Sequence, residues 1–168
     1  MVEITDKKSP IKIELERTAE LIKGCSESQF YLQQAKDLKD INFSRISEVL
    51  SLKDATAIRK IEFQPHHCYL NAFKVAAFIP DMEYCEGFLH LGINIEHAFN
   101  IYKGRYYIDP TVELCLNRDP TQENPGLLKV FDFDVVKDLF IRNEMCASVY
   151  RYEFKKNNPD LRFHSDLS

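Results

Sequence analysis

The stretch 97–111, HAFNIYKGRYYIDPT, decides how the chain folds. Two runs rich in aromatic and β-branched residues, His97–Tyr102 and Arg105–Ile108, lie on either side of Lys103–Gly104. Such runs around a two-residue step that contains glycine predict an antiparallel hairpin. The hairpin brings His97 and Asp109 side by side, near the ends of adjacent strands. An imidazole and a carboxylate are therefore expected to meet there.

A buried helix is predicted upstream of this hairpin, over residues 68–78 (CYLNAFKVAAF), with Pro80 just beyond its end. Apolar side chains recur at positions 69, 72, 73, 76 and 77, which is the spacing of one helix face. Cys68 lies at the start of this helix, where unpaired amides and the positive end of the helix dipole stabilise a thiolate. The same turn offers a backbone N–H to an oxyanion.

Cys68, His97 and Asp109 together make a candidate catalytic triad. A carboxylate that binds one imidazole nitrogen orients the ring and leaves the other nitrogen for the thiol, as in nucleophilic acyl chemistry. Single cysteines and histidines are more often structural. The remaining candidates are interpreted in that way: Cys25, Cys85, Cys115, Cys146, His90 and His164.

The chain resembles the transglutaminase-like branch of the papain-fold cysteine enzymes. The motifs that carry the resemblance are Tyr84-x-Glu86-Gly87, His97-Ala98-Phe99-Asn100 and Gly104-x-Tyr106-Tyr107-Ile108-Asp109-Pro110-Thr111. They lie within residues 64–112, and Phe99 stands where the family usually has Trp. The resemblance implies that Cys68 is the nucleophile, His97 the general base and acid, and Asp109 the group that orients the imidazole.

Gln64 is a candidate oxyanion-hole residue, because papain-like enzymes carry a glutamine upstream of their cysteine. Its spacing from Cys68 differs from theirs, so a plain polar loop residue is an equal alternative. Asn71, one turn past Cys68, is expected to bond nearby backbone, and Asn100 to point to the opposite face of its strand from His97. Both are interpreted as structural.

We predict one α+β domain over residues 1–155, with a papain/transglutaminase-like core. In this core the helix that carries the cysteine packs on a small antiparallel sheet. Residues 11–62 form a helical N-terminal part, 63–112 the catalytic core and 156–168 a polar tail. Further elements are expected as strands at 82–91, 127–131 and 148–154 and as a helix through 135–145 capped by Asp132 or Asp134. Glu86–Gly87 is expected to be a bulge or a point of close packing.

The composition limits the classes of partner. The 168 residues carry 22 Lys and Arg against 26 Asp and Glu, for a net charge of −4. Without a basic cluster this balance argues against a nucleic-acid partner. No apolar run approaches the roughly 20 residues of a membrane span, and the first residues lack a secretory-signal pattern. The five scattered cysteines are typical of reduced thiols, so we expect a cytoplasmic protein without a membrane partner.

These features predict a cysteine-dependent amide hydrolase, either a peptidase or a glutamine deamidase, that acts on a protein or peptide and needs no cofactor. The alternatives are a binding module on a degenerate papain-like scaffold and a transamidase or acyltransferase. Arylamine N-acetyltransferases share the Cys-His-Asp order but expect Arg-Gly-Gly where this chain has Pro65-His66-His67. A zinc site is disfavoured, because the nearby His and Cys residues lack the usual zinc spacing.

Overall fold

The computed structural model describes residues 36–38, 40–91, 94–123, 125–142 and 147–159. The elements in chain order are β1 (Lys36–Asp37), β2 (Asn42–Phe43), α3 (Ile46–Val49), α4 (Leu52–Arg59), α5 (Cys68–Phe78), β3 (Met82–His90), β4 (Asn94–Tyr102), β5 (Tyr106–Ile108), the π-helix η1 (Thr111–Cys115), the 3₁₀-helix η2 (Pro120–Gln122), β6 (Pro125–Phe131), α6 (Phe133–Arg142) and α7 (Val149–Asn157). This content confirms the expected α+β class.

The strands form one six-stranded sheet in the order β1-β6-β3-β4-β5-β2. Four of the five neighbouring pairs are antiparallel, but β2 runs parallel to β5. The expectation of a purely antiparallel sheet is therefore wrong at this edge. β2 has only two residues, and its partner lies far along the chain, so no local pattern marks the pairing.

The connection between the two edge strands requires the sheet to curl. Fully extended, the chain from Asp37 to Asn42 spans at most about 18 Å. In a flat six-stranded sheet the edge strands would lie about 24 Å apart. Leu38 and Ile41 of this connection pack against a cluster on one sheet face that contains Phe99 and Tyr107. The sheet therefore curls around that cluster.

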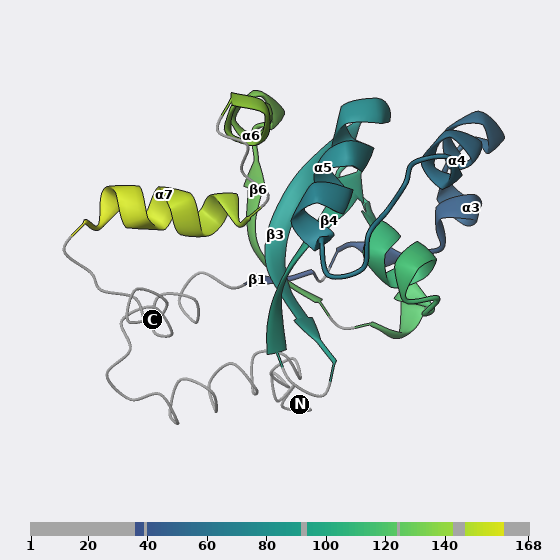
Figure 1. Ribbon diagram of the computed structural model, residues 1–168. Coiled ribbons are helices and arrows are strands. Elements are labelled where there is room, and N and C mark those ends of the chain that lie inside the picture. The colour runs from purple at the N-terminus through teal and green to yellow at the C-terminus, as the bar shows by residue number, and fades with distance from the viewer. Residues whose placement is uncertain (1–35, 39, 92–93, 124, 143–146, 160–168) are drawn as a thin grey trace, which may run out of the picture.

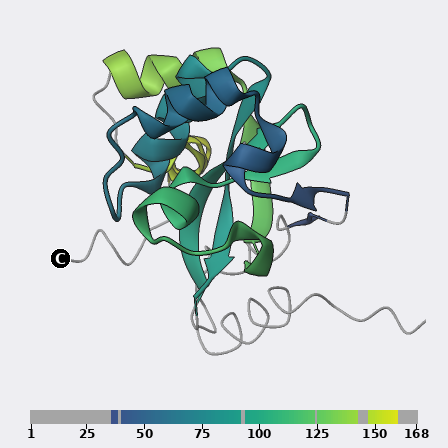
Figure 2. The ribbon, with the colours of Figure 1, turned by 90° about the vertical axis from the view of Figure 1, so that its right-hand side faces the viewer.

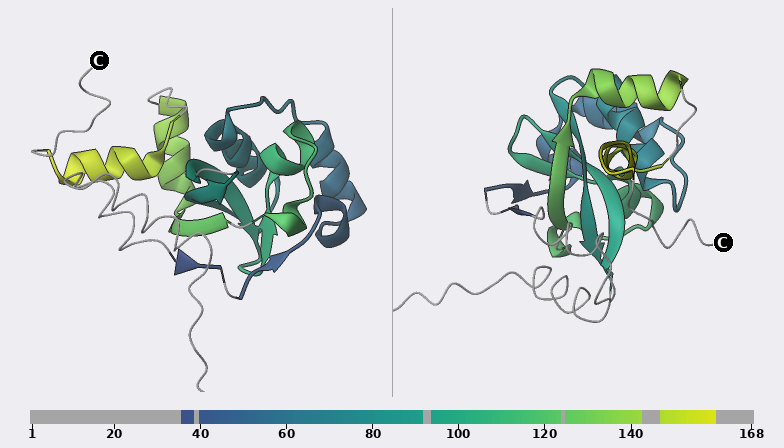
Figure 3. Two further views of the ribbon diagram at one scale, coloured as in Figure 1. Left: turned by 90° about the horizontal axis from the view of Figure 1, so that it is seen from below. Right: turned by 90° about the vertical axis from the view of Figure 1, so that its left-hand side faces the viewer.

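Helix α5 packs on β3 and β4, with α6 and α7 on one flank and α3 and α4 on the other (Figures 1 and 3). Figure 2 shows α3 and α4 from their own side of the molecule. On the first flank, the core joins Ala72 of α5 to side chains of the sheet, α6 and α7. On the second flank, Val75 of α5 packs with Ile46 and Ile58. Helix α5 is thus wedged between two apolar clusters, which fixes the position of Cys68 at its first turn.

The hairpin that joins β4 to β5 has the predicted turn. Lys103 and Gly104 both have positive φ, 53° and 62°, and the Arg105 N–H donates to the Tyr102 carbonyl at 3.1 Å. This is the I′ geometry that matches strand twist, and it confirms the predicted hairpin. β4 begins at Asn94, earlier than expected, so His97 lies inside the strand.

Gly87 allows β3 to approach β6 closely. The register between these strands shifts between Glu86 and Gly87, and a Cβ atom built on Gly87 would lie 1.8 Å from the Gly126 carbonyl oxygen. The expectation of a bulge with close packing at this step is confirmed. Glycine is required here for space rather than for backbone conformation.

Two predicted elements are wrong. Residues 148–154, expected as a strand, form instead the N-cap Ser148 and the first turns of α7, which continues to Asn157 into the predicted polar tail. The helical part predicted for 11–62 contains two strands, Lys36–Asp37 and Asn42–Phe43, because these segments pair with β6 and β5. Residues 11–35 of that part, with Cys25, lie outside the described residues, as do Cys146 and His164.

The remaining boundaries differ slightly from those expected. α6 runs over Phe133–Arg142, and the Asp132 carboxylate accepts from the Asp134 N–H, so Asp132 is the capping residue of the two candidates. β6 starts at Pro125, two residues earlier than predicted. Among the described residues, none of the helices has the length and apolar character that crossing a bilayer would require.

Candidate active site

Cys68 is the first residue of α5 and is partly exposed. A tight turn leads into it, in which the His67 N–H donates to the Gln64 carbonyl at 3.3 Å. Pro65 occupies the second position of this turn, and His66 the third, with φ of 65°. Left-handed backbone at a residue other than glycine is uncommon and clusters at functional sites. The backbone thus reverses sharply just before the thiol.

The start of α5 has no side-chain cap from the preceding residue. The His67 side chain forms no capping hydrogen bond, and the first hydrogen bond of the helix runs from the Asn71 N–H to the His67 carbonyl at 2.9 Å. The N–H groups of the first turn have no acceptor within a helix. They are suited to stabilise negative charge on the Cys68 sulfur or on a carbonyl oxygen bound beside it.

His97 and Asp109 form a buried pair. The Nε2 atom of His97 lies 2.6 Å from Oδ2 of Asp109, and the two side chains are 3% and 0% exposed. The last registered pair of β4 and β5 is Asn100 with Ile108, so the chain leaves β4 at Asp109. An ionised carboxylate only accepts hydrogen bonds, so Nε2 carries the proton and Nδ1 is the nitrogen that remains for other chemistry.

Four donors saturate the Asp109 carboxylate. Oδ2 accepts from His97 and from the Tyr107 hydroxyl, each at 2.6 Å. Oδ1 accepts from the N–H groups of Thr111 and Val112, each at 3.0 Å. Burial by itself raises the pKa of Asp109, but the charge and hydrogen bond of His97 and the bonds from Tyr107 and Val112 outweigh it and lower the pKa. Asp109 therefore stays ionised inside the protein.

Cys68 contributes to the raised pKa of the His97 imidazole. Burial by itself lowers the pKa of His97, but the charge and hydrogen bond of Asp109, joined by a hydrogen bond and charge from Cys68, raise it to about 10. The raised pKa favours the protonated ring at neutral pH, paired with the Asp109 carboxylate. Of the three residues selected from the sequence, the structure thus joins His97 and Asp109 directly, and Cys68 is among the groups that raise the pKa of His97.

Asn71 connects the segment before Cys68 to the segment after Asp109. Its buried side-chain amide exchanges two hydrogen bonds with the Gln64 backbone, at 3.1 and 2.8 Å, and donates to Thr111 Oγ1 at 3.1 Å. The expectation that Asn71 bonds nearby backbone is confirmed. Its bond to Thr111 was not expected, because no sequence pattern reports a contact over such a separation.

Gln64 is exposed, and the hydrogen bonds that hold it run through its backbone. Asn71 therefore fixes the main chain at Gln64 and leaves the side-chain amide at the surface, close in sequence to Cys68. Asn100 lies on the opposite face of β4 from His97, as expected, where its amide donates to the Ala72 carbonyl at 3.0 Å. It supports the middle of α5 and is structural.

Tyr107 is the residue near this cluster that sequence reasoning did not assign to the site. A signal was present, because residues two apart on a strand point to the same face, and Tyr107 precedes Asp109 by two.

A second polar network lies beside the cluster. Glu96, adjacent to His97, is bound by Arg151 of α7 at 2.7 Å and accepts from the Tyr69 hydroxyl at 3.4 Å.

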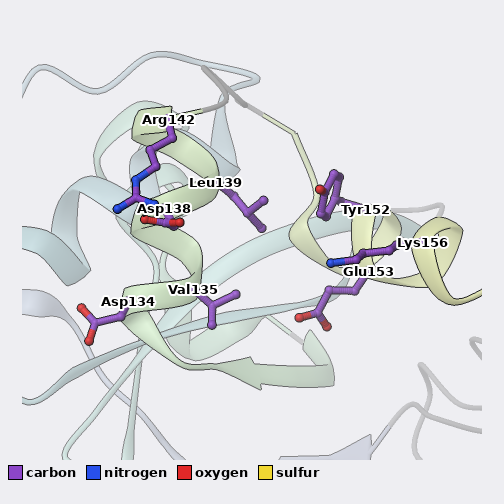
Figure 4. A pocket seen from close by; sticks show the side chains of 8 residues that line it. All are labelled: Asp134, Val135, Asp138, Leu139, Arg142, Tyr152, Glu153 and Lys156. Carbon is purple, nitrogen blue, oxygen red and sulfur yellow. Dashed lines mark ion pairs between the residues drawn. The ribbon is translucent and has the colours of Figure 1, made fainter.

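A separate groove lies between α6 and α7 (Figure 4). Its volume is about 580 Å³, and Leu139 faces Tyr152 across it, with the Asp138–Arg142 ion pair on one wall. Cys68, His97 and Asp109 do not line it.

Within the described ranges, no cluster of three or more His, Cys, Asp or Glu side chains could hold a metal ion.

Comparisons of this chain with models of protein families, with curated proteins and with solved structures gave no match.

Proposed function

We propose that this protein is a cysteine-dependent amide hydrolase, either a peptidase or a glutamine deamidase. Cys68 is the nucleophile, His97 the general acid and base, and Asp109 the residue that orients the imidazole. One observation carries the proposal: the buried His97 ring is held at Nε2 by Asp109 at 2.6 Å, and Cys68 is among the groups that raise the pKa of that ring. An imidazolium between a carboxylate and a sulfur is suited to activate a thiolate.

The mechanism starts with attack of the Cys68 thiolate on the carbonyl carbon of an amide. A C–S bond forms, and the carbonyl π electrons move to the oxygen. When this oxyanion collapses, the C–N bond breaks and His97 gives its Nδ1 proton to the leaving amine or ammonia. His97 then takes a proton from water as the water attacks the thioester. The C–S bond breaks, which releases a carboxylic acid and restores the thiolate.

The oxyanion would be stabilised at the start of α5. The Cys68 N–H belongs to the first turn, which has no acceptor inside the helix. The side-chain amide of Gln64 is the proposed second donor, since Asn71 anchors the Gln64 backbone. A donor of this kind contributes roughly 10²- to 10³-fold to acyl transfer.

A papain/transglutaminase-like core is part of the proposal. Three features support it: the cysteine begins a helix that packs on the sheet, the histidine lies on the next hairpin, and the aspartate follows the second strand of that hairpin. The motifs within residues 64–112 have the order of that family. The resemblance favours hydrolysis or transfer of an acyl group through a thioester.

Alkylation by iodoacetamide across a range of pH tests the proposal. We expect one thiol to react much faster than the others at neutral pH. The fast reaction should vanish in Cys68→Ala and slow in His97→Ala. Cys115→Ala is the matched control, because Cys115 is also partly exposed and should leave the fast reaction intact.

The products then separate the types of reaction. Glutamine-containing peptides incubated with the enzyme should lose ammonia or be cleaved, as read by mass spectrometry. Transfer to an added amine would indicate a transamidase, and labelling of Cys68 by acyl-coenzyme A an acyltransferase. Uniformly slow alkylation of every thiol would overturn the proposal and leave a binding module.

A further inference from the structure

Tyr107 contributes a hydroxyl to the buried carboxylate that holds His97. The hydroxyl donates to Asp109 Oδ2 at 2.6 Å, the same atom that His97 Nε2 contacts at 2.6 Å. The Tyr107 side chain is fully buried. Its ring is packed between Phe43 and Phe99, each with a centroid distance of 5.0 Å. This packing fixes the direction from which the hydroxyl approaches the carboxylate.

We propose that Tyr107 is a positioning residue of the active site, which keeps Asp109 ionised and aimed at His97. This inference rests on the proposed function. Two donors compete for one oxygen, so the hydroxyl withdraws electron density from Oδ2 and lowers its affinity for the shared proton. The proton therefore stays on the imidazole, which remains able to stabilise the Cys68 thiolate and to protonate the leaving group.

The pKa shifts of Tyr107 and Asp109 are consistent with this role. Burial raises the pKa of Tyr107, and the charge of Asp109 raises it further, so the hydroxyl keeps its proton and acts as a donor. The bond from Tyr107 is one of the causes that lower the pKa of Asp109. The hydrogen-bonded groups that face the carboxylate are His97, Tyr107 and the two backbone amides of Thr111 and Val112. Tyr107 is the one of these that can be replaced without removing the imidazole or the backbone.

The chain offers a closely matched control. Tyr84 is also fully buried on a strand, and its hydroxyl donates at 2.7 Å to the carboxylate of Glu86, two residues further on. Glu86 caps the start of α7 through the Val149 N–H at 2.8 Å and does not contact His97 in the described hydrogen bonds. Tyr84→Phe therefore removes the same group from the same kind of site without touching the His97–Asp109 pair.

Carboxyl NMR titration and alkylation kinetics test the role of Tyr107 in the full chain. In Tyr107→Phe we expect the titration of the Asp109 carboxyl to move to higher pH than in the wild type. The rate constant for alkylation of Cys68 at neutral pH should fall roughly tenfold, because the hydrogen bond that is lost goes to a charged group. Tyr84→Phe should change neither measurement. An unchanged Asp109 titration in Tyr107→Phe, or an equal change in Tyr84→Phe, would overturn the inference.

The unmodified protein gives a second measurement, which does not depend on the variant folding. The ζ carbon of Tyr107 should shift over the same pH range in which Asp109 titrates, and the absence of that shift would overturn the inference. Slow alkylation of Cys68 in the wild type would overturn the proposed function instead. The Asp109 titrations remain measurable in that case, so the two failures are distinguishable.

Discussion

The Nε2 atom of His97 lies 2.6 Å from Oδ2 of Asp109, in a pair that is almost fully removed from solvent. A buried ion pair of this kind is costly to break from one side, because the remaining charge is left without a partner. Asp109 also accepts from Tyr107, Thr111 and Val112, so its replacement leaves four donors unpaired. The stability of the fold therefore depends on this carboxylate, and so does the reactivity that we propose for Cys68.

Asp109→Asn should test that dependence. The amide presents N–H groups or a single oxygen to donors that need two anionic oxygens, so we expect a loss of about 3–5 kcal/mol in the free energy of unfolding. Urea denaturation measures this loss. Asp119→Asn is the control, because Asp119 forms an ion pair with Arg45 at the exposed surface and should matter little. Equal stability of the Asp109 variant and the wild type would contradict a buried ionic pair.

The His97–Asp109 pair should make stability depend on pH in a defined direction. The pKa of His97 is raised from 6.5 to about 10, so its contribution is fully present below pH 6.5 and is lost as the pH rises through about 10. The pKa of Asp109 is lowered from 3.8, so its contribution is present above pH 3.8 and is lost as the pH falls further. The urea midpoints of the wild type and His97→Gln should therefore differ most between pH 3.8 and pH 6.5, where both contributions are present. A constant difference from pH 4 to 10 would count against the pair.

Two serine caps should differ in their contribution to stability. Ser148 begins α7, where it accepts from the Arg151 N–H at 3.1 Å and donates to the buried Glu86 carboxylate. Ser51 begins α4 at the surface and accepts from the Asp54 N–H at 3.1 Å. We expect Ser148→Ala to cost about 2 kcal/mol and Ser51→Ala about 1 kcal/mol, measured by thermal unfolding. Equal losses would show that the Glu86 contact contributes nothing.

Replacement of Gly87 or Gly104 by alanine should destabilise the fold for two different reasons. A methyl group at Gly87 meets the Gly126 carbonyl oxygen at 1.8 Å, so Gly87→Ala should separate β3 from β6 at a cost of about 3 kcal/mol or more. Gly104 has open space around it but a φ of 62°, so Gly104→Ala should cost roughly 1–2 kcal/mol. Denaturant midpoints compare the two variants. A Gly87→Ala protein as stable as Gly104→Ala would argue against the close approach of β3 to β6.

Elements set by local chemistry could be predicted from the sequence, and elements set by distant partners could not. The hairpin at Lys103–Gly104 and helix α5 follow from turn residues and apolar spacing. The strand prediction for residues 148–154 is wrong, because the start of α7 is held by Glu86, far away in the chain. The parallel pairing of β2 likewise depends on a partner that no neighbouring residue reveals.

The candidate site divides in the same way. The nearness of His97 and Asp109 could be predicted from the hairpin, since its register continues toward Phe99 and Asp109, two residues from His97. Their direct contact forms where the chain leaves β4, which the turn does not determine. The approach of Cys68 depended on the resemblance of the motifs, since nothing local relates a helix start to a strand downstream. The bond from Asn71 to Thr111 could not be predicted, because it requires the packing of α5 against η1.

The short link from Asp37 to Asn42 has a consequence for how the molecule comes apart. This link joins the two edge strands, β1 and β2. Proteolytic cleavage within it would therefore remove the covalent connection that holds both edge strands in place. The apolar cluster around the Tyr107 ring would then pack less tightly, although the residues of the candidate triad would be unchanged. A few peptide bonds between the two edge strands thus determine how tightly the sheet curves around the cluster that contains Tyr107.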